Sequence, residues 1–292
     1  MNLYSILRFV PLHLLSRISG ILASVTLPVK LRKPLYTLFG RIYGVRFHEV
    51  ENKLEDYSRF VDFFTRNLIA DARSIENGTS ILSPVDGRVL EYGNINNSEL
   101  IQAKGITYTT HDLISDKQLV NRFEHGSYAT FYLAPGDYHH IHSPVTGSLL
   151  KRVYIPGALF PVSLGAVKNI PSLYCSNERV ISWISATDED WLVIFVGATN
   201  VGSIGLSYEP EFRQQQGKAR YQSQFSRKLG GDVLVKEYSD KPIPIYRGER
   251  IGTFYLGSTV IIISSRKISW IDSLTSGSRV FYGTRIGDKA TV

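Results

Sequence analysis

The fold is decided by stretches such as GTFYLGSTVIIIS at residues 252–264, in which two apolar runs flank a Leu-Gly-Ser turn. Three further stretches have the same character: TFYLAPGDY at 130–138, LVIFVGATNVGSIGL at 192–206 and SRVFYGTRIG at 278–287. Short runs rich in Val, Ile, Tyr, Phe and Thr, bounded by Gly, Pro, Asn and Asp, are typical of strands. No long helical pattern recurs between them, which argues against a doubly wound α/β sheet. We therefore predict a mainly β fold of the α+β class, an antiparallel core of short strands preceded by amphipathic helices.

Two stretches sixty positions apart resemble each other: SPVDGRVL at 83–90 and SPVTGSLL at 143–150. Pro followed by Asp-Gly or Thr-Gly indicates a turn that leads into a strand. One explanation is two similar turns in a β-rich protein. The other is an old internal duplication that leaves two related β units facing each other.

The net charge of +7 is concentrated at the N-terminus. Residues 1–48 contain seven basic side chains and no Asp or Glu, whereas the rest of the chain holds 26 residues of each sign. A nucleic-acid-binding protein would need a basic face on its folded body, so nucleic acid is not an expected partner. The lone Cys175 excludes an intrachain disulfide and a Cys-based zinc cluster.

The N-terminal segment also carries an apolar stripe whose members recur at three- and four-residue steps between residues 3 and 25. This is the spacing of one or two amphipathic helices. The longest stretch without Lys or Arg, residues 18–29, has twelve residues, whereas a membrane span needs roughly 20. We predict that residues 1–48 form a basic segment that lies on an anionic membrane. The alternative is that the stripe packs on the protein itself. Residues 49–292 would be the catalytic domain, with one helix over residues 51–70.

A histidine cluster and an Asp-Gly turn contain the polar residues of most chemical interest. His139, His140 and His142 fall within four positions, and in an extended segment His140 and His142 would share a face that His139 does not. Clustered histidines suggest a metal first. No Cys or further ligand pattern accompanies them, so we predict no metal site. Asp86 precedes a glycine and by itself indicates only a turn residue.

Gly257 and Ser258 form the third motif. Between two apolar runs, Gly-Ser is usually a hairpin turn or a kink. A serine hydroxyl can also attack the preceding peptide carbonyl when a base accepts its proton. The dipeptide alone is a very weak signal for this chemistry.

Taken together, the motifs resemble those of one family. SPVDGRV, DYHHIHSP, VGATNVGSI and GTFYLGSTVI occur in the order and spacing of phosphatidylserine decarboxylase proenzymes. The flanking stretches RFVDFFTRNL, QAKGITY, YIPGALFPV and NERVI fit the same pattern. The resemblance covers essentially the whole chain and is to the bacterial, membrane-associated members whose cleavage motif is LGST.

The resemblance implies a pyruvoyl enzyme that makes its own cofactor by autocatalytic serinolysis between Gly257 and Ser258. The Ser258 hydroxyl attacks the Gly257 carbonyl to give an ester, and β-elimination then releases the upstream chain. The dehydroalanine left at position 258 hydrolyses to a pyruvoyl group and ammonia. The products are a beta chain of residues 1–257 and an alpha chain of residues 258–292, which form a heterodimer; a higher oligomer is left open.

Three further residues receive roles from the resemblance. His142 and Asp86 complete a self-cleavage triad with Ser258, the histidine as base and the aspartate as the group that orients it. His139 matches the histidine of the decarboxylation step, as the acid or the carboxylate-orienting group. His140 stays outside the catalytic set, and no substrate-binding residue is predicted.

The implied reaction is decarboxylation of phosphatidylserine to phosphatidylethanolamine and CO₂, with the pyruvoyl group as Schiff-base partner and electron sink. The expected partner is an anionic phospholipid membrane, and the expected location is peripheral, on the cytoplasmic face of the inner membrane. One alternative is a pyruvoyl decarboxylase of a soluble amino acid, for which a lipid-facing segment has no purpose. Another is a non-catalytic β-sandwich carrier module, which would have a lysine in the turn that holds Asp86.

Two loops have open assignments. Residues 196–204, VGATNVGSI, are either a strand with a close backbone approach or a pocket wall near position 258. Residues 155–164, IPGALFPVSL, line either an acyl-chain entrance or the core.

Overall fold

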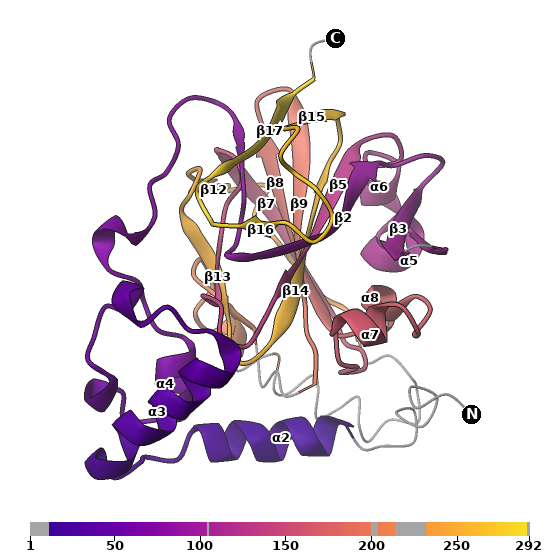
Figure 1. The fold of residues 1–292 in the computed structure, drawn as a ribbon. Helices are drawn as coiled ribbons and strands as arrows, with labels where there is room; N and C mark the ends of the chain where they lie inside the picture. The colour runs from indigo at the N-terminus through magenta and orange to yellow at the C-terminus, as the bar shows by residue number, and fades with distance from the viewer. Residues whose placement is uncertain (1–11, 104, 200–203, 214–215, 217–231, 291–292) are drawn as a thin grey trace.

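The computed structural model describes residues 12–103, 105–199, 204–213, 216 and 232–290 (Figure 1). Its helical elements are α2 (Leu12–Ala23), α3 (Val29–Tyr43), η1 (Phe47–Glu49), η2 (Leu54–Asp56), α4 (Phe60–Phe64), η3 (Ala70–Ala72), α5 (Thr110–Ile114), α6 (Lys117–Val120), α7 (Leu164–Val167) and α8 (Leu173–Ser176). Its strands are β1 (Ile81–Leu82), β2 (Gly87–Asn94), β3 (Glu99–Ala103), β4 (Ile106–Thr109), β5 (Ser127–Leu133), β6 (His140–His142), β7 (Gly147–Ile155), β8 (Arg179–Ala186), β9 (Glu189–Val196), β10 (Ile204–Leu206), β11 (Leu234–Glu237), β12 (Ile243–Ile245), β13 (Arg250–Phe254), β14 (Ser258–Ser264), β15 (Ile268–Trp270), β16 (Arg279–Val280) and β17 (Arg285–Lys289).

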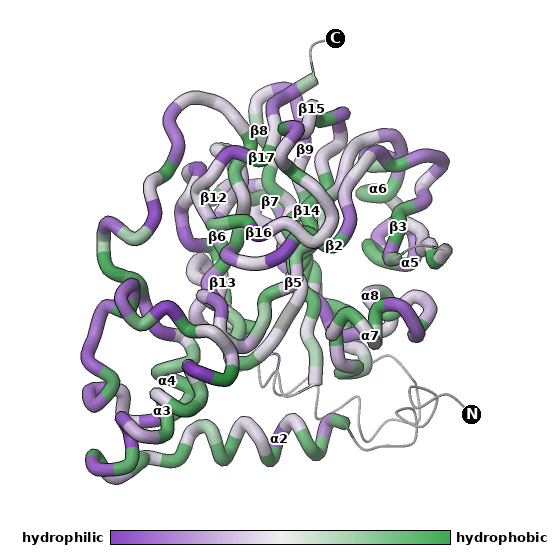
Figure 2. The backbone as a smooth tube through the Cα atoms, viewed as in Figure 1, coloured by the Kyte–Doolittle hydropathy of each residue, from purple (hydrophilic) through white to green (hydrophobic). Residues whose placement is uncertain are grey.

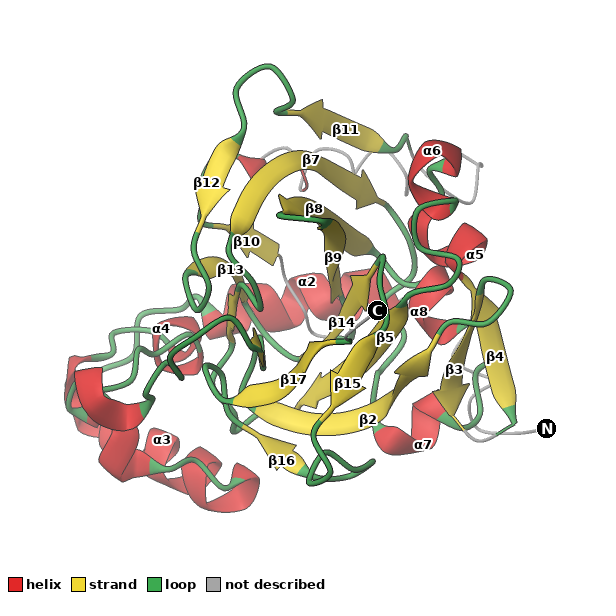
Figure 3. Cartoon of the chain, turned by 90° about the horizontal axis from the view of Figure 1, so that it is seen from above, coloured by secondary structure: helices red, strands yellow, loops and turns green. Residues whose placement is uncertain are grey.

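The centre of the molecule is a nine-stranded antiparallel sheet in the order β11-β7-β8-β9-β14-β5-β2-β16, with β12 paired to β7. Figure 3 shows β7 and β2 as curved strands on opposite sides, with β8, β9, β14 and β5 between them. Every residue of β9 is buried, as are residues 259–264 of β14. Strands buried on both faces become continuously apolar, which accounts for runs such as TVIII. The predicted α+β class with an antiparallel core is confirmed.

The smaller sheets are β10-β13-β6, β1-β17-β15 and the hairpin β3-β4. Strand β13 belongs to one of them and β14 to the large sheet, so residues 255–257 carry the chain from one sheet to the other. The Gly257–Ser258 peptide lies where this crossover enters the central strand.

The turn at Asp86, here called the Asp86 turn, is held by three local hydrogen bonds. The Ser83 hydroxyl donates to the Val85 carbonyl at 2.8 Å. The Gly283 N–H donates to the Ser83 carbonyl at 3.1 Å. The Tyr282 N–H donates to the Asp86 carboxylate at 3.0 Å.

The turn at Thr146, here called the Thr146 turn, repeats each of these bonds. The Ser143 hydroxyl donates to the Val145 carbonyl at 2.7 Å. The Gly248 N–H donates to the Ser143 carbonyl at 2.8 Å, and the Arg247 N–H donates to the Thr146 hydroxyl at 3.1 Å. Such detailed equivalence favours the internal duplication over two unrelated turns.

The two turns also bond to each other in a reciprocal way. The Leu82 N–H donates to the Pro144 carbonyl at 3.1 Å, and the His142 N–H donates to the Pro84 carbonyl at 2.8 Å. Leu82 and His142 each precede the serine of their turn, so they occupy equivalent positions. The related units therefore face each other, as the duplication predicts.

The predicted helix over residues 51–70 is wrong. Only two short helical pieces, η2 and α4, form there. Arg59 makes a β-bridge with Thr26, which ties the segment to the chain that follows α2. The spacing of the aromatic residues suggested a single helix, but these residues pack in two separate clusters. Phe63 stacks on Tyr36, with ring centroids 4.6 Å apart, whereas Phe64 packs toward the crossover at residues 255–257. Tertiary contacts thus override the local pattern.

Helix α2 confirms an amphipathic helix within the stripe of residues 3–25, of which residues 1–11 lie outside the described part, and α3 is a second N-terminal helix beyond that stripe. Helix α2 buries Leu12, Ser16 and Ala23 against the protein. Figure 2 shows apolar positions recurring along both helices. Large apolar side chains remain exposed on both helices and on the connection between them, and we call these the outer apolar face: Leu14, Leu15, Ile18, Ile21, Leu22, Val25, Val29, Leu31, Leu35, Leu38 and Ile42. None of the described helices is long and apolar enough to cross a membrane.

Candidate active site

Asp86 and Ser258, two of the residues expected to be catalytic, lie at the same end of the large sheet. Strands β2 and β14 are both antiparallel to β5, which lies between them, so they run in the same direction. Thr259 pairs with Tyr132, and Tyr132 pairs with Arg88. Asp86 directly precedes β2, and Ser258 begins β14. With strands about 4.8 Å apart, the two main chains are separated by roughly 10 Å.

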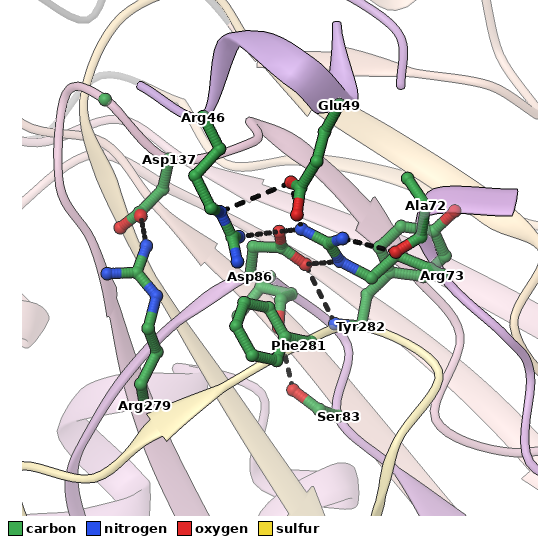
Figure 4. Close-up of polar contacts among 12 residues, drawn as sticks. Arg46, Glu49, Ala72, Arg73, Ser83, Asp86, Asp137, Arg279, Phe281 and Tyr282 are labelled. Atoms are coloured by element: carbon green, nitrogen blue, oxygen red, sulfur yellow. Dashed lines mark hydrogen bonds and ion pairs between the residues drawn. The ribbon is translucent and has the colours of Figure 1, made fainter. Parts of the chain in front are cut away.

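Asp86 is completely buried and accepts four hydrogen bonds (Figure 4). Arg73 donates from both Nε, at 3.1 Å, and Nη2. Arg46 donates from Nη2 at 3.2 Å, and the Tyr282 N–H supplies the fourth bond. Glu49 bridges the two guanidinium groups, at 3.2 Å from Arg46 and 2.8 Å from Arg73. A buried carboxylate needs such charge-assisted donors, and this network fixes the orientation of Asp86.

His142 is held as a neutral imidazole whose Nε2 is an acceptor. Its Nδ1 lies 2.7 Å from the Gly248 carbonyl, which can only accept, so Nδ1 carries the proton. Nε2 accepts from the Tyr138 hydroxyl at 3.3 Å. The ring stacks on Tyr282 with centroids 3.9 Å apart. Burial lowers the pKa of His142 to about 4, against the smaller opposing effects of the hydrogen bond to Gly248 and, weaker still, of the Asp86 charge.

No hydrogen bond joins Asp86 to His142 in the described structure. Tyr282 connects them instead, because its N–H binds the carboxylate while its ring covers the imidazole. The orientation that the resemblance assigns to Asp86 is supplied here by the Gly248 carbonyl, and the Asp86 charge is only a minor influence on the pKa of His142. The side chain of Ser258 is outside what the structure describes, so its contact with His142 stays a prediction.

His139 occupies a separate, apolar setting. Its Nδ1 donates to the Asp137 carbonyl at 2.9 Å, and its ring lies 4.1 Å from that of Phe64. Its Nε2 is buried and has no hydrogen-bond partner among the described residues. Burial lowers the pKa of His139 to about 3, so the ring is neutral at physiological pH.

His140 and His142 both lie against Tyr138, at ring distances of 4.8 and 5.8 Å, which agrees with the predicted shared face. Both nitrogens of His140 are bonded, Nδ1 to the Thr253 hydroxyl at 2.7 Å and Nε2 to the Thr65 carbonyl at 3.0 Å. Its role is therefore to tie β6 to its neighbours.

Sequence reasoning missed the arginines around Asp86. Arg46 was counted with the membrane-associating segment, but its side chain reaches the site, and no local pattern marked Arg73. The sequence did contain a signal for Tyr282, the residue that connects Asp86 to His142. GERIG at 248–252 repeats as GTRIG at 283–287, and extending the duplication to this pair would have located Gly248 and Tyr282 beside the two turns.

The two loops with open assignments contact each other, and one of them begins next to Ser258. Val196 pairs with Thr259, so the VGATNVGSI motif begins beside Ser258, although residues 200–203 are outside the described part. The Thr199 hydroxyl donates to the Leu159 carbonyl at 2.5 Å and thereby joins this motif to the 155–164 loop.

Comparison with known proteins agrees with this arrangement. The family model for phosphatidylserine decarboxylase matches residues 60–288. The phosphatidylserine decarboxylase proenzyme of Myxococcus xanthus (strain DK1622) is 33% identical, covering 97% of this chain and 96% of the relative. That of Anaeromyxobacter sp. (strain K) is 36% identical over 98% of both chains. The mitochondrial proenzyme of Rattus norvegicus is 32% identical over 97% of this chain and 74% of its own length. The chain belongs to the phosphatidylserine decarboxylase family.

Proposed function

We propose that this protein cleaves itself between Gly257 and Ser258, and that the mature enzyme decarboxylates phosphatidylserine to phosphatidylethanolamine. The observation that supports the proposal is that this peptide begins β14 on the same side of the large sheet as Asp86, which precedes β2, while main-chain hydrogen bonds tie His142 to Pro84 of the Asp86 turn and His139 to Phe254 just before the peptide. The relatives' names, phosphatidylserine decarboxylase proenzyme, supply the substrate and the processing step.

For self-cleavage, His142 is in the form that a base requires. Because its pKa is lowered to about 4, it is neutral at pH 7, and its Nε2 lone pair can accept the Ser258 hydroxyl proton once the 3.3 Å hydrogen bond from the Tyr138 hydroxyl is exchanged. The hydroxyl oxygen then attacks the Gly257 carbonyl. The buried Asp86 carboxylate stabilises the imidazolium that forms, through charge rather than direct contact.

The cleaved pieces would stay together because the cut leaves both sheet partners of β14 in place. Strand β14 pairs with β5 along residues 258–264 and with β9 along residues 259–264. The alpha chain, residues 258–292, thus remains a central strand of the sheet formed by residues 1–257. The same pairing would hold the new N-terminus at the site.

The mature site would use a pyruvoyl group derived from Ser258, which supplies an electron sink for the departure of CO₂. His139 fits such a group: the Phe254 N–H, four residues before Ser258, bonds to the His139 carbonyl at 3.0 Å. The unpartnered Nε2 of His139 is a proton acceptor. We assign it the task of relaying a proton to the substrate α-carbon during decarboxylation. A neutral nitrogen that can only accept a hydrogen bond does not attract the substrate carboxylate. We therefore prefer proton transfer over carboxylate orientation as the role of His139.

The outer apolar face of α2 and α3 supports peripheral binding to a membrane. These exposed side chains are accompanied by Lys30 and Arg41, and the sequence up to residue 48 contains no acidic residue. Apolar insertion together with cationic side chains suits an anionic lipid surface. We propose that this surface is the cytoplasmic face of the inner membrane, where the phosphatidylserine is presented.

The test is release of CO₂ from carboxyl-labelled phosphatidylserine in vesicles, with free serine as the competing substrate. We expect turnover of the lipid alone, and none by Ser258→Ala. Faster turnover of free serine would instead support the soluble-substrate alternative. Turnover of the lipid by Ser258→Ala would contradict the assignment of Ser258.

A further inference from the structure

Leu256, two residues before the proposed cleavage serine, has a backbone conformation that leucine rarely adopts. Its φ is 140°, and Gly257 follows with a φ of 38°. The other described non-glycine residues with positive φ are Asn, Asp or Ser with values of 50–72°, the left-handed region that such residues tolerate. A branched apolar residue at 140° is strained, and strain of this kind persists only where the surroundings impose it.

The surroundings do impose it here, because the Leu256 side chain is anchored in an apolar cluster. Leu256 is 9% exposed and packs with Ala23 of α2 and with Val61 and Phe64 of α4. We call this group the Leu256 cluster. Its members come from three separate parts of the chain, so it forms only when the N-terminal helices are seated on the β domain.

The main chain on either side of Leu256 is fixed as well. Upstream, the Phe254 N–H is bonded to the His139 carbonyl at 3.0 Å. Downstream, Ser258 is paired with Leu133 at the start of β14. The crossover is therefore held at both ends and in the middle, and the strain cannot relax by movement of the loop.

We propose that Leu256 is a positioning residue for self-cleavage: its buried side chain holds the crossover in the strained conformation and so presents the Gly257 carbonyl to the Ser258 hydroxyl. This rests on the proposed cleavage at Gly257–Ser258. When that peptide bond breaks, residue 257 becomes a free chain end and the strain at Leu256 is released. The strain thus raises the energy of the uncleaved precursor relative to the products.

The first measurement is the rate of self-cleavage during pulsed synthesis of the full chain, followed by denaturing electrophoresis and mass spectrometry. We expect Leu256→Gly to cleave at least tenfold more slowly, because it removes both the anchor and the strain. Leu256→Ala should fall between Leu256→Gly and the wild type. Val61→Ala, which loosens the cluster without changing the crossover, should slow cleavage less. The matched control is Leu100→Ala on β3, a fully buried leucine outside the cluster, which should cleave at the wild-type rate.

The second measurement separates strain from loss of packing. In a Ser258→Ala background, which keeps the chain intact, Leu256→Gly should unfold at a higher temperature than Leu256→Ala, because glycine tolerates a positive φ. At Leu100 the order should be reversed, with alanine more stable than glycine, as is usual within a strand.

The outcomes distinguish the two proposals. If the wild type is not cleaved after Gly257, the proposed function itself fails. If the wild type is cleaved there and Leu256→Gly is cleaved equally fast, only the positioning role is overturned. Leu256→Ala unfolding above Leu256→Gly would show that residue 256 is unstrained and would also overturn it.

Discussion

The Asp86 turn and the Thr146 turn share a backbone frame but differ completely in their surroundings. Asp86 is fully buried beneath Arg46 and Arg73, whereas Thr146 is exposed and its hydroxyl accepts a hydrogen bond from the Arg247 backbone N–H. The position before the turn serine differs as well, being leucine at 82 and histidine at 142. One half of the duplication therefore supplies the acidic residue of the proposed site and the other half supplies the base.

This comparison shows that the frame alone does not make a site. Both turns offer the same N–H to the side chain at the equivalent position. Of the two turns, only the Asp86 turn is packed against the segment that carries Arg46, Glu49 and Arg73. That segment buries the Asp86 carboxylate and places charged side chains around it.

The largest expected effect comes from converting one turn into the other. Asp86→Thr should leave two guanidinium groups without their buried carboxylate, abolish self-cleavage, and destabilise a Ser258→Ala chain by about 3–5 kcal/mol. Urea unfolding and the yield of cleaved fragments measure the two effects. The matched control, Thr146→Ala in the exposed turn, should change neither. Normal cleavage by Asp86→Thr would show that the two turns are functionally interchangeable.

A second prediction separates the two chemical steps. His139→Ala should still cleave itself but decarboxylate phosphatidylserine about 100- to 10,000-fold more slowly, the usual contribution of a proton-transfer group. The assay is CO₂ release per pyruvoyl group. His140→Asn serves as the neighbouring control and should lose far less activity. Failure of His139→Ala to cleave would mean that both steps share this histidine.

A third prediction concerns how stability depends on pH. It replaces His142 by leucine, the residue at the equivalent position 82 of the other repeat. Burial lowers the pKa of His142 to about 4, from about 6.5 in the unfolded chain, so only the unfolded state gains a proton between these values. Stability should therefore fall as pH drops from 6.5 toward 4. Between pH 7 and pH 4.5, a Ser258→Ala chain should lose free energy of unfolding, as measured with urea. Adding His142→Leu should make that loss about 2–3 kcal/mol smaller. An unchanged pH dependence would mean that His142 titrates normally.

The smallest effect concerns the N-terminal helices that cover the duplicated core. Leu22→Asp on the outer apolar face should weaken binding to phosphatidylserine vesicles about tenfold, because burying a leucine contributes about 1.5–3 kcal/mol. Vesicle co-sedimentation measures it. Ile101→Asp, an exposed apolar residue on β3, is the control and should bind normally. Equal binding by both variants would point to another membrane-contacting surface.

Much of the fold could be predicted from the sequence, because strand runs such as TVIII and turns such as SPVDG carry local signals. The repeat of SPVDG as SPVTG was visible for the same reason. The helix over residues 51–70 was predicted wrongly, since Phe63 and Phe64 serve different clusters that only tertiary structure defines. Arg46 and Arg73 could not be found, because a sequence does not distinguish an exposed arginine from one that reaches a carboxylate distant in the chain. The strain at Leu256 is likewise a property of three segments packed together.

The most direct test of the central claim is denaturing mass spectrometry of a preparation that decarboxylates phosphatidylserine. The account predicts two chains, residues 1–257 and residues 258–292, the second beginning with a pyruvoyl group in place of Ser258. An intact chain of 292 residues as the only species in an active preparation would contradict it.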